Sequence, residues 1–350
     1  MAEKTEFQKQ LQNICISGMI SASIALGSRL HLFEALASVG SAENPATPKQ
    51  VAEKAGCKER YVKEWLSTMA VGKVIEVNKD EKFWIPKENV EAHCYRFSLG
   101  LGMTVTKLQD LTCGLDVQFN QFLPLLLGPY NKVCDVFKTE GPLGLTYEDF
   151  TDFYETQSSV SEAYHKNHFI SDLIPALGAD MPERLDKGEL MCLDVGCGNG
   201  FHAALLAQTY PKSNFTGIDI TLEAVHLANQ QRQVSTFRLF TTPAIGLTDN
   251  GQMFDNLAFI QMNASKMDDD WTEKYDLVTV IDACHDQMRP DLCLKEIYRV
   301  LKQGGVFGML EIKGTSNVFT DREEIGLTAA LSYTCSVFHC LPVGSNSPGK

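Results

Sequence analysis

The sequence lacks the features of exported, membrane-spanning and zinc-binding proteins. None of its 11 cysteines forms a CxxC pair, and no cluster of Cys and His has the spacing of zinc ligands. The first residues, MAEKTEFQKQ, do not have the charged-then-apolar layout of a signal peptide, and no uninterrupted apolar run reaches spanning length. We therefore expect a cytoplasmic protein with reduced thiols, no metal site and no membrane partner.

Basic residues are also few. The chain has 31 Lys and Arg against 44 Asp and Glu, a formal net charge of −13. Because a nucleic-acid footprint needs clustered Lys and Arg, this balance argues against nucleic acid as a partner, although a small basic patch would still fit within it. The length of 350 residues, of which 44% are hydrophobic, is enough for two cores.

The first 99 residues predict a winged-helix domain. Helical spacing of apolar residues is followed by a short hairpin. Three of the expected helices are 5–28, 29–39 and 60–70. A further helix is expected between the second and third of these, starting at Thr47-Pro48 and stopping at Gly56. The expected hairpin strands are 74–77 and 83–85. A winged helix raises DNA binding as an alternative function. The helix in the recognition position mixes Lys58, Arg60 and Lys63 with Glu59 and Glu64, which is typical of a solvated face.

Residues 100–187 form a mostly helical connector rich in aromatic residues, where we expect part of a substrate cavity and its lid. From residue 188 onward, strands and helices alternate, which predicts an α/β fold with a doubly wound, mainly parallel sheet. The expected strands are 190–195, 215–220, 257–262, 277–281 and 306–312, and the helices between them are 201–208, 222–231 and 290–301.

The strongest motif lies at the end of the first of these strands. It reads Asp194-Val195-Gly196-Cys197-Gly198-Asn199-Gly200, and Asp219 ends the next strand. Glycines allow a turn in which backbone approaches a ligand closely, and ligands of such sheets bind at the carboxyl ends of strands. Asp219 is placed to accept hydrogen bonds from ribose hydroxyls. A dinucleotide site would share this acidic residue but shows GxGxxG, whereas this loop reads DxGxGxG.

The motif resembles that of class I S-adenosylmethionine-dependent methyltransferases, and the layout resembles the small-molecule O-methyltransferases that carry an N-terminal winged helix. The resemblance implies S-adenosylmethionine as cofactor, with the glycine loop around its amino-acid end, Asp219 on the ribose and Asn263-Ala264 against the adenine. The cofactor-binding residues that it implies are Asp194, Gly196, Cys197, Gly198, Gly200, Asp219, Ile220, Asn263, Ala264 and Asp282. Asn263 stands where the family more often has Asp, and residues 299–305 look like its helix-to-strand turn.

The resemblance also implies a catalytic pair, His285-Asp286, after the fourth strand. His285 would remove the acceptor proton during methyl transfer, for which a pKa near neutrality is suited, and Asp286 would orient it. The alternative is that His285 only caps the strand or lines the cavity. The acceptor is expected to be a hydroxyl of a small molecule, with nitrogen, sulfur and carbon still open. A cofactor-binding winged-helix regulator without catalysis is the alternative function.

Three further expectations concern the rest of the chain. The long N-terminal helix has an apolar face without an obvious partner, so we expect a homodimer through residues 5–39. Residues 234–243 look like an insertion. Only 38 residues follow Ile312, and they contain no pair of strands, so we expect the family's sixth and seventh strands to be missing and the domain 188–350 to be truncated. The fifth strand would then be an uncovered apolar edge, and we expect a poorly stable or aggregation-prone domain with weakened activity unless residues 333–341 cover that edge.

Overall fold

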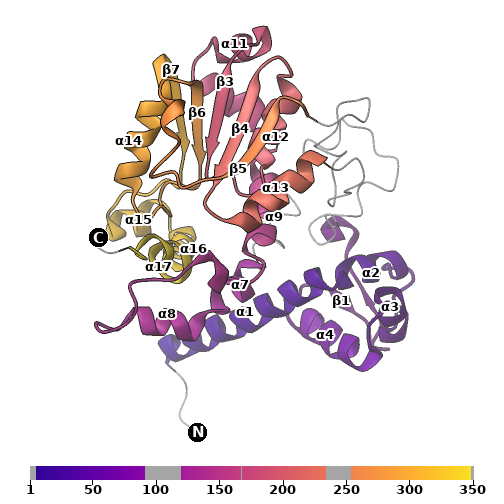
Figure 1. Ribbon diagram of the computed structural model, residues 1–350. Coiled ribbons are helices and arrows are strands. Elements are labelled where there is room, and N and C mark those ends of the chain that lie inside the picture. The colour runs from indigo at the N-terminus through magenta and orange to yellow at the C-terminus, as the bar shows by residue number, and fades with distance from the viewer. Residues whose placement is uncertain (1–4, 91–119, 167, 234–253, 348–350) are drawn as a thin grey trace. The chain divides into compact units, whose positions relative to one another are not determined.

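The computed structural model describes residues 5–90, 120–166, 168–233 and 254–347 (Figure 1). The chain divides into two compact units, Met1–Leu125 and Leu126–Lys350. The expected insertion at 234–243 and the expected domain boundary near residue 99 lie outside the described residues.

The first unit has the helices and hairpin of a winged-helix domain. Its elements are α1 (Glu6–Arg29), α2 (Leu32–Val39), α3 (Pro48–Ala55), α4 (Glu59–Val71), β1 (Glu76–Val77), β2 (Phe83–Trp84) and η1 (Lys87–Asn89). As the sequence predicts, Thr47 caps α3 in a capping box with Gln50, and α3 ends at Gly56, whose φ is +67°. The two hairpin strands pair antiparallel.

The core of the first unit is formed by α2, α3, α4 and β2, and α1 packs against it. Trp65 packs edge-on against Phe33 with ring centroids 4.9 Å apart, and its indole N–H donates to the carbonyl of Ser23 at 2.9 Å. A Cβ atom on Gly27 would lie 2.4 Å from the Trp65 ring, so glycine lets α1 approach α4 this closely. Only the second half of α1 is used in this core. In its first half, large apolar side chains are exposed, namely Phe7, Leu11, Ile14 and Ile16.

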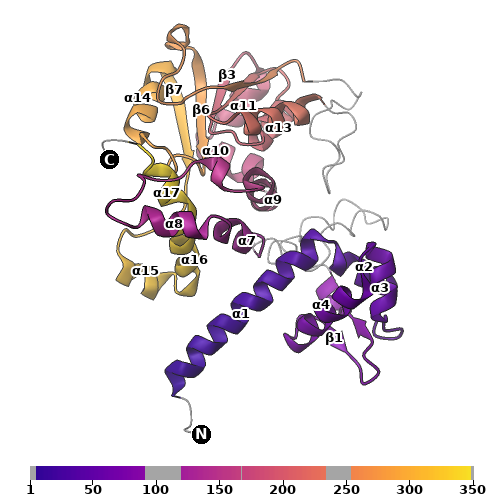
Figure 2. The same ribbon diagram turned by 60° about the horizontal axis from the view of Figure 1, so that its bottom comes forward.

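The second unit is a parallel sheet with helices around it (Figures 1 and 2). The division between the units falls within α7 (Phe122–Leu127). The helical elements before the sheet are α8 (Tyr130–Val136), η4 (Tyr147–Asp149), α9 (Phe153–His165), η5 (Phe169–Leu173), α10 (Ile174–Ala176) and α11 (Met181–Lys187). The sheet domain follows with β3 (Met191–Val195), α12 (Phe201–Thr209), β4 (Asn214–Asp219), α13 (Leu222–Gln233), β5 (Leu257–Gln261), η6 (Asp269–Trp271), β6 (Tyr275–Ile281), α14 (Pro290–Val300) and β7 (Leu301–Leu310).

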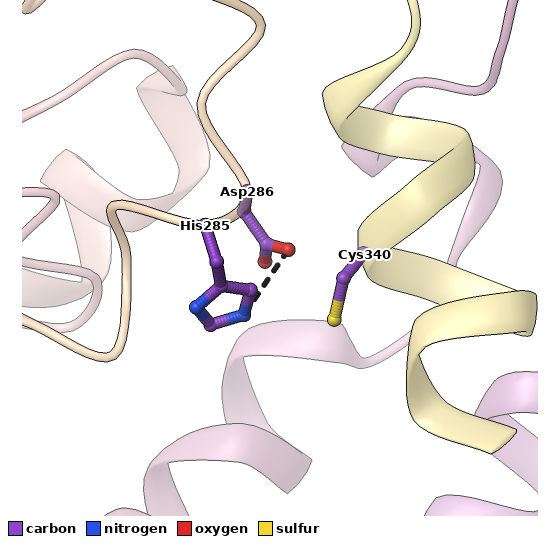
Figure 3. Close-up of side chains that lie close together, drawn as sticks. All are labelled: His285, Asp286 and Cys340. Carbon is purple, nitrogen blue, oxygen red and sulfur yellow. Dashed lines mark ion pairs between the residues drawn. The ribbon is translucent and has the colours of Figure 1, made fainter. Parts of the chain in front are cut away.

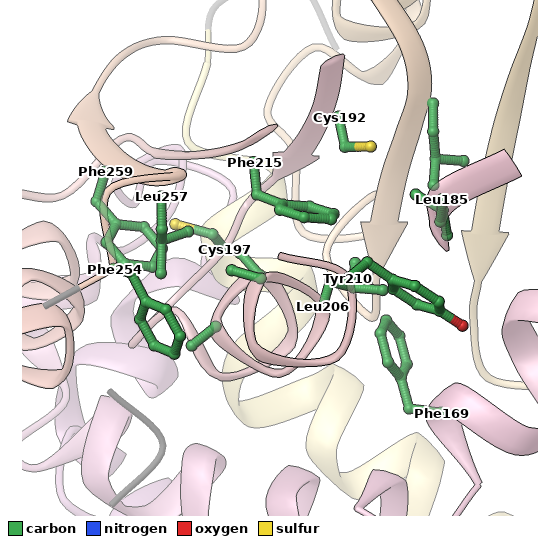
Figure 4. Close-up of a cluster of buried hydrophobic side chains, with 14 of the residues drawn as sticks. Phe169, Leu185, Cys192, Cys197, Leu206, Tyr210, Phe215, Phe254, Leu257 and Phe259 are labelled. Carbon is green, nitrogen blue, oxygen red and sulfur yellow. The ribbon is translucent and has the colours of Figure 1, made fainter. Parts of the chain in front are cut away.

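The strand order is β5-β4-β3-β6-β7, and every neighbouring pair is parallel. The central strands β3 and β6 are almost wholly buried, as expected for strands that are covered on both faces. Figure 4 shows one of the two cores, in which Phe215 and Phe259 from the sheet pack near Leu206 of α12 and Phe169 of η5. The predicted α/β fold with a doubly wound parallel sheet is confirmed.

The structure corrects the expected turn at 299–305. α14 ends at Val300 and β7 begins directly at Leu301, five residues before the expected start of the strand. Gly304 and Gly305 lie inside the strand, where Gly304 has a φ of +78° and the register with β6 shifts between Tyr275 and Leu277. The glycines therefore mark an irregularity in a long strand, not its start.

After β7, the described chain contains helices only: α15 (Val318–Glu324), α16 (Leu327–Cys335), η7 (Ser336–Cys340) and α17 (Leu341–Gly344). Gly326, at a φ of +69°, separates α15 from α16. Within the described residues the sheet has five strands, as expected, with β7 at one edge. Phe307 and Met309 of β7 are 37% and 51% exposed, so part of this edge is open to solvent.

By length and composition, the two stretches Glu6–Arg29 and Leu327–Gly344 could each cross a membrane. Each also belongs to a folded unit. Ser23 of the first accepts the indole N–H of Trp65, and the carbonyl of Pro342 in the second accepts the N–H of Leu145 at 3.0 Å. We therefore describe both as elements of the folded units.

Because strand β7 is exposed at the edge of the sheet, we predict that copies of the chain associate through it. Met309→Lys should reduce aggregation of the purified chain several-fold, because a charged side chain on an edge opposes strand pairing. Dynamic light scattering during a slow temperature ramp measures this. Val71→Lys, at an 86% exposed apolar position in the winged-helix domain, is the control with the same change of charge. Equal aggregation of the two variants, or a sharp unfolding transition of a soluble wild-type protein, would contradict the prediction.

Candidate active site

The glycine loop joins β3 to α12. Gly196, Gly198 and Gly200 all have positive φ, at +73°, +53° and +85°, which L side chains rarely adopt. A Cβ atom on Gly196 would lie 2.7 Å from Cβ of Ala283, and one on Gly200 would lie 2.4 Å from the ring of Phe259. At Gly198 a Cβ would meet nothing within 4 Å, so the backbone there faces open space.

Asp219 at the end of β4 fastens this loop. Its carboxylate accepts hydrogen bonds from the N–H of Gly198 at 3.1 Å and from the N–H and hydroxyl of Thr221 at 3.0 and 3.1 Å. Burial raises the pKa of Asp219 although these donors lower it. Ile220, the next residue, is 41% exposed. The loop and the acidic residue that the sequence singled out therefore lie side by side.

Asp194 is buried beneath the loop. One carboxylate oxygen accepts from the hydroxyl of Thr279 at 2.9 Å, whereas Oδ2 is buried without a hydrogen-bond partner. Burial raises the pKa of Asp194 to about 7. An unpartnered buried carboxylate oxygen costs free energy unless a ligand or water satisfies it. Cys197 contributes a buried thiol to the same loop.

The remaining predicted cofactor residues follow β5 and β6. Asn263 comes after β5, where its side-chain oxygen accepts from the N–H of Ser265, and Ala264 is buried next to it. Asp282 follows β6 with a φ of +52°; its Oδ1 is buried without a hydrogen-bond partner, and its Oδ2 accepts from Gln157 at 3.4 Å. The open backbone at Gly198 and the unpartnered oxygens of Asp194 and Asp282 fit a polar ligand of the kind that the motif implies.

His285 lies among carboxylates. Its Nδ1 is 2.5 Å from Oε2 of Glu311 and 4.0 Å from Oδ1 of Asp282, and its Nε2 is 3.3 Å from Oδ1 of Asp286. Figure 3 shows His285 beside Asp286, with Cys340 on the far side of that carboxylate. Burial alone would lower the pKa of His285, but the hydrogen bond to Glu311 and the three negative charges together raise it to about 9.

Sequence reasoning missed Glu311. It follows β7 directly and also accepts the backbone N–H groups of Cys284 and His285, at 2.8 and 3.3 Å. Since β7 is the parallel neighbour of β6, residues just after the two strands meet at one edge of the sheet. An acidic residue at the end of the fifth strand was the available signal, in the sequence Gly308-Met309-Leu310-Glu311.

Asp282, His285 and Glu311 also offer atoms within 4.8 Å of one another, close enough to hold a metal ion, although their sequence spacing gave no such signal. The 2.5 Å contact joins Nδ1 of His285 directly to Glu311, so the charge of this one carboxylate is already compensated by the histidine. The absence of a metal requirement stays a prediction.

Helix α9 of the connector contacts the loop and its surroundings at several points. The hydroxyl of Tyr154 lies 2.6 Å from that of Thr221, the residue bonded to Asp219. The amide of Asn199 donates to Glu162 at 3.3 Å, and His165 pairs with the buried His202 at 2.9 Å. Helix α9 of the connector thus packs against the loop, and its role as a lid stays a prediction.

Residues 186–331 match the family model of a methyltransferase domain, and residues 18–94 match that of an Rv2258c-like winged HTH domain. The chain carries a methyltransferase domain behind a winged helix-turn-helix domain. The two matches fall on the predicted winged-helix and methyltransferase regions, and the resemblance to winged-helix methyltransferases is confirmed.

Solved structures share this fold along almost the whole chain. A putative O-methyltransferase from Nostoc punctiforme is 14% identical, with a TM-score of 0.60 and coverage of 97% of this chain and 88% of that one. Human N-acetylserotonin methyltransferase, solved with S-adenosylmethionine, is 17% identical, with a TM-score of 0.55 and the same coverage. At these identities the likeness shows the fold.

Curated relatives match over shorter stretches. The fatty-acid O-methyltransferase of Mycolicibacterium smegmatis is 27% identical over 116 residues, which are 33% of this chain and 34% of that protein. The sterol 24-C-methyltransferase of Saccharomyces cerevisiae is 26% identical over 182 residues, 52% of this chain and 39% of that protein. The chain thus spans between about a third and two fifths of the length of these two relatives.

Proposed function

We propose that this protein transfers a methyl group from S-adenosylmethionine to a hydroxyl of a small molecule, with His285 as the general base. The observation that carries the proposal is the placement of the His285–Glu311 pair at the same sheet edge as the glycine loop and Asp219. A base and a cofactor loop at one edge can hold an acceptor and a methyl donor together.

The cofactor would lie along the residues that the motif named. The loop from Gly196 through Cys197 and Gly198 to Gly200 would hold its amino-acid end, with Asp194 beneath. Asp219 and Ile220 would meet the ribose, Asn263 and Ala264 the adenine, and Asp282 would border the site. When bound, the cofactor supplies an activated methyl group on a sulfonium. The unpartnered Oδ2 of Asp194 supports this proposal.

Cofactor binding is the first test. Wild-type protein should bind S-adenosylmethionine and its demethylated product in isothermal titration calorimetry. Asp219→Ala should weaken binding by at least about tenfold, since it removes a charged acceptor of hydrogen bonds, worth roughly 1.5–3 kcal/mol. Asp270→Ala, at an exposed aspartate, is the matched control. Well-folded wild-type protein that binds neither compound, or an Asp219→Ala variant with unchanged affinity, would refute the proposal.

In the proposed reaction, His285 takes the hydroxyl proton. Its Nδ1 faces Glu311, which orients the ring and stabilises the imidazolium that forms, so Nε2 receives the proton. Asp286 lies on the Nε2 side and helps to align the ring. Because the pKa of His285 is raised to about 9, the free protein holds mostly the imidazolium form at neutral pH. The base therefore becomes available as the pH rises.

Two kinetic results follow from a base of this kind. His285→Ala should lower kcat by roughly 10²–10⁴ while the affinity for the cofactor stays nearly unchanged. In the wild type, kcat/KM should rise with pH up to about 9, the pKa of His285, and then level off. Methyl transfer to any accepted small molecule, measured across pH, checks both. His168→Ala, at an exposed histidine paired with Asp172, is the control. An unchanged kcat in His285→Ala would make His285 a pocket residue only.

The acceptor class remains broad. Aromatic side chains of the connector, including Tyr147, Phe150, Phe153 and Tyr154, gather beside the site and favour a flat or apolar molecule. Curated relatives named for fatty-acid and sterol methylation agree with an apolar acceptor. The sterol enzyme is named for methylation at carbon, so a carbon acceptor is the second chemistry to screen.

The charges of α4 do not favour the regulator alternative. Lys58 lies over the ring of Tyr61, Arg60 pairs with Glu64, and Lys63 pairs with Glu81 at 2.8 Å. Cations that are engaged in this way are less available for phosphates, which supports an enzyme that does not bind nucleic acid.

A cytoplasmic homodimer is the assembly that we propose for this enzyme. The exposed apolar residues in the first half of α1 support it, because exposed faces of this kind commonly mark interfaces. Light scattering at micromolar concentration should give the mass of a dimer, and Leu11→Glu with Ile14→Glu should give a monomer. Tyr298→Glu, at an 81% exposed residue of α14, is the control. A monomeric wild type would contradict the proposal.

A further inference from the structure

His339 lies on the other side of Asp286 from His285. It comes from η7 in the C-terminal helical segment, more than fifty residues after the His285-Asp286 pair. Its Nδ1 is 3.6 Å from Oδ2 of Asp286, whose Oδ1 faces Nε2 of His285 at 3.3 Å. Glu311, His285, Asp286 and His339 thus form a continuous row of four side chains.

Three aromatic rings fix the orientation of the His339 ring. It stacks on Phe153 with centroids 4.3 Å apart and an interplanar angle of 6°, meets Phe150 edge-on at 4.6 Å, and lies 5.7 Å from Tyr147. The residue is only 4% exposed. Burial, with the charge of His285 as a smaller cause, lowers the pKa of His339 to about 3, so the ring is neutral.

A neutral ring beside a carboxylate has one favourable tautomer. With the proton on Nδ1, an N–H group faces Asp286, and the buried unpartnered atom is the acceptor Nε2. The other tautomer would set a lone pair against the carboxylate and bury an unpaired N–H among aromatic rings, which is the costlier arrangement. The surroundings therefore select a ring that directs a donor toward Asp286.

Cys340, the next residue, adds a second donor from η7. Its side chain lies beside that of Asp286 (Figure 3). The thiol hydrogen-bonds to the Asp286 carboxylate, and burial raises the pKa of the thiol, which keeps it as S–H. Burial raises the pKa of Asp286 itself, and the charge of His285 and the bond to Cys340 oppose this. Asp286 thus depends on its neighbours to stay ionised.

We propose that His339 is a positioning residue, which holds the Asp286 carboxylate against Nε2 of His285 and thereby sets the charge state of the histidine that acts as base. Its effect on turnover rests on the proposed function, whereas its effect on His285 does not. The titratable groups that face His285 are Asp282, Asp286, Glu311 and His339, and those that face Asp286 are Tyr147, Asp282, His285, Glu311, His339 and Cys340.

The test is the pKa of His285, measured by NMR on the full chain labelled at histidine, with its signal assigned by its loss in His285→Gln. His339→Phe keeps a ring to stack on Phe153 but removes the N–H. We expect it to lower the pKa of His285 by about one unit, because the Asp286 carboxylate is then no longer held against Nε2 and its negative charge stabilises the imidazolium less. Phe338→Leu, in the same turn but stacked on Tyr130, should leave that pKa unchanged.

A second pair of variants separates the effect of the N–H donor of His339 from the effect of the packing of its ring. His339→Asn and His339→Leu both lose the ring, but only Asn places an N–H about where Nδ1 stands. Asn should keep the pKa of His285 near that of the wild type, and Leu should lower it as Phe does. The inference is overturned if the pKa of His285 is the same in the wild type, in His339→Phe and in His339→Leu, while Asp286→Asn lowers it. His339 would then be a core residue only. Failure to bind the cofactor would refute the proposed function and leave this titration readable.

Discussion

The parallel pairing of the sheet is the constraint on which the rest of the site depends. Because β3, β4, β6 and β7 run in one direction side by side, the residues that follow them meet at one edge. The glycine loop, Asp219, His285 and Glu311 each follow or end a different strand. The bond from the N–H of Gly198 to Asp219 then ties the first two ends together, and the pair of His285 and Glu311 ties the other two.

The C-terminal helices lie at this same end of the sheet, where the site residues meet. In both views α16 and α17 lie beside α8 of the connector, and Phe338 of η7 stacks with Tyr130 of that helix (Figures 1 and 2). Residues 327–344 are therefore held between the connector and the His285-Asp286 loop, not along the exposed strand β7. The chain after β7 contributes side chains to the candidate site, while the strand itself keeps Phe307 and Met309 in solvent.

The sequence predicted local features of the site well because each depends on neighbours in the chain. The glycine loop has positive φ at three positions, and the strand ends at Val195 and Asp219 follow from buried apolar runs. Glu311 and His339 could not be found in this way. The role of Glu311 depends on which strand lies beside β6. The role of His339 depends on η7, a helix without a sequence motif, packing next to the His285-Asp286 loop. The start of β7 was missed for a related reason: Gly304-Gly305 has the composition of a turn, and only pairing with β6 makes it strand.

The charges of the site fit a cation better than a neutral molecule. Asp282, Asp286 and Glu311 surround a single histidine, so even with His285 protonated the group is negative when all three carboxylates are ionised. Buried negative charge is costly unless it is compensated, and a ligand with a positive centre would lower that cost. A sulfonium carries such a charge, and the thioether left after methyl transfer does not. The electrostatics that hold His285 as an imidazolium would therefore also favour the proposed methyl donor over its product.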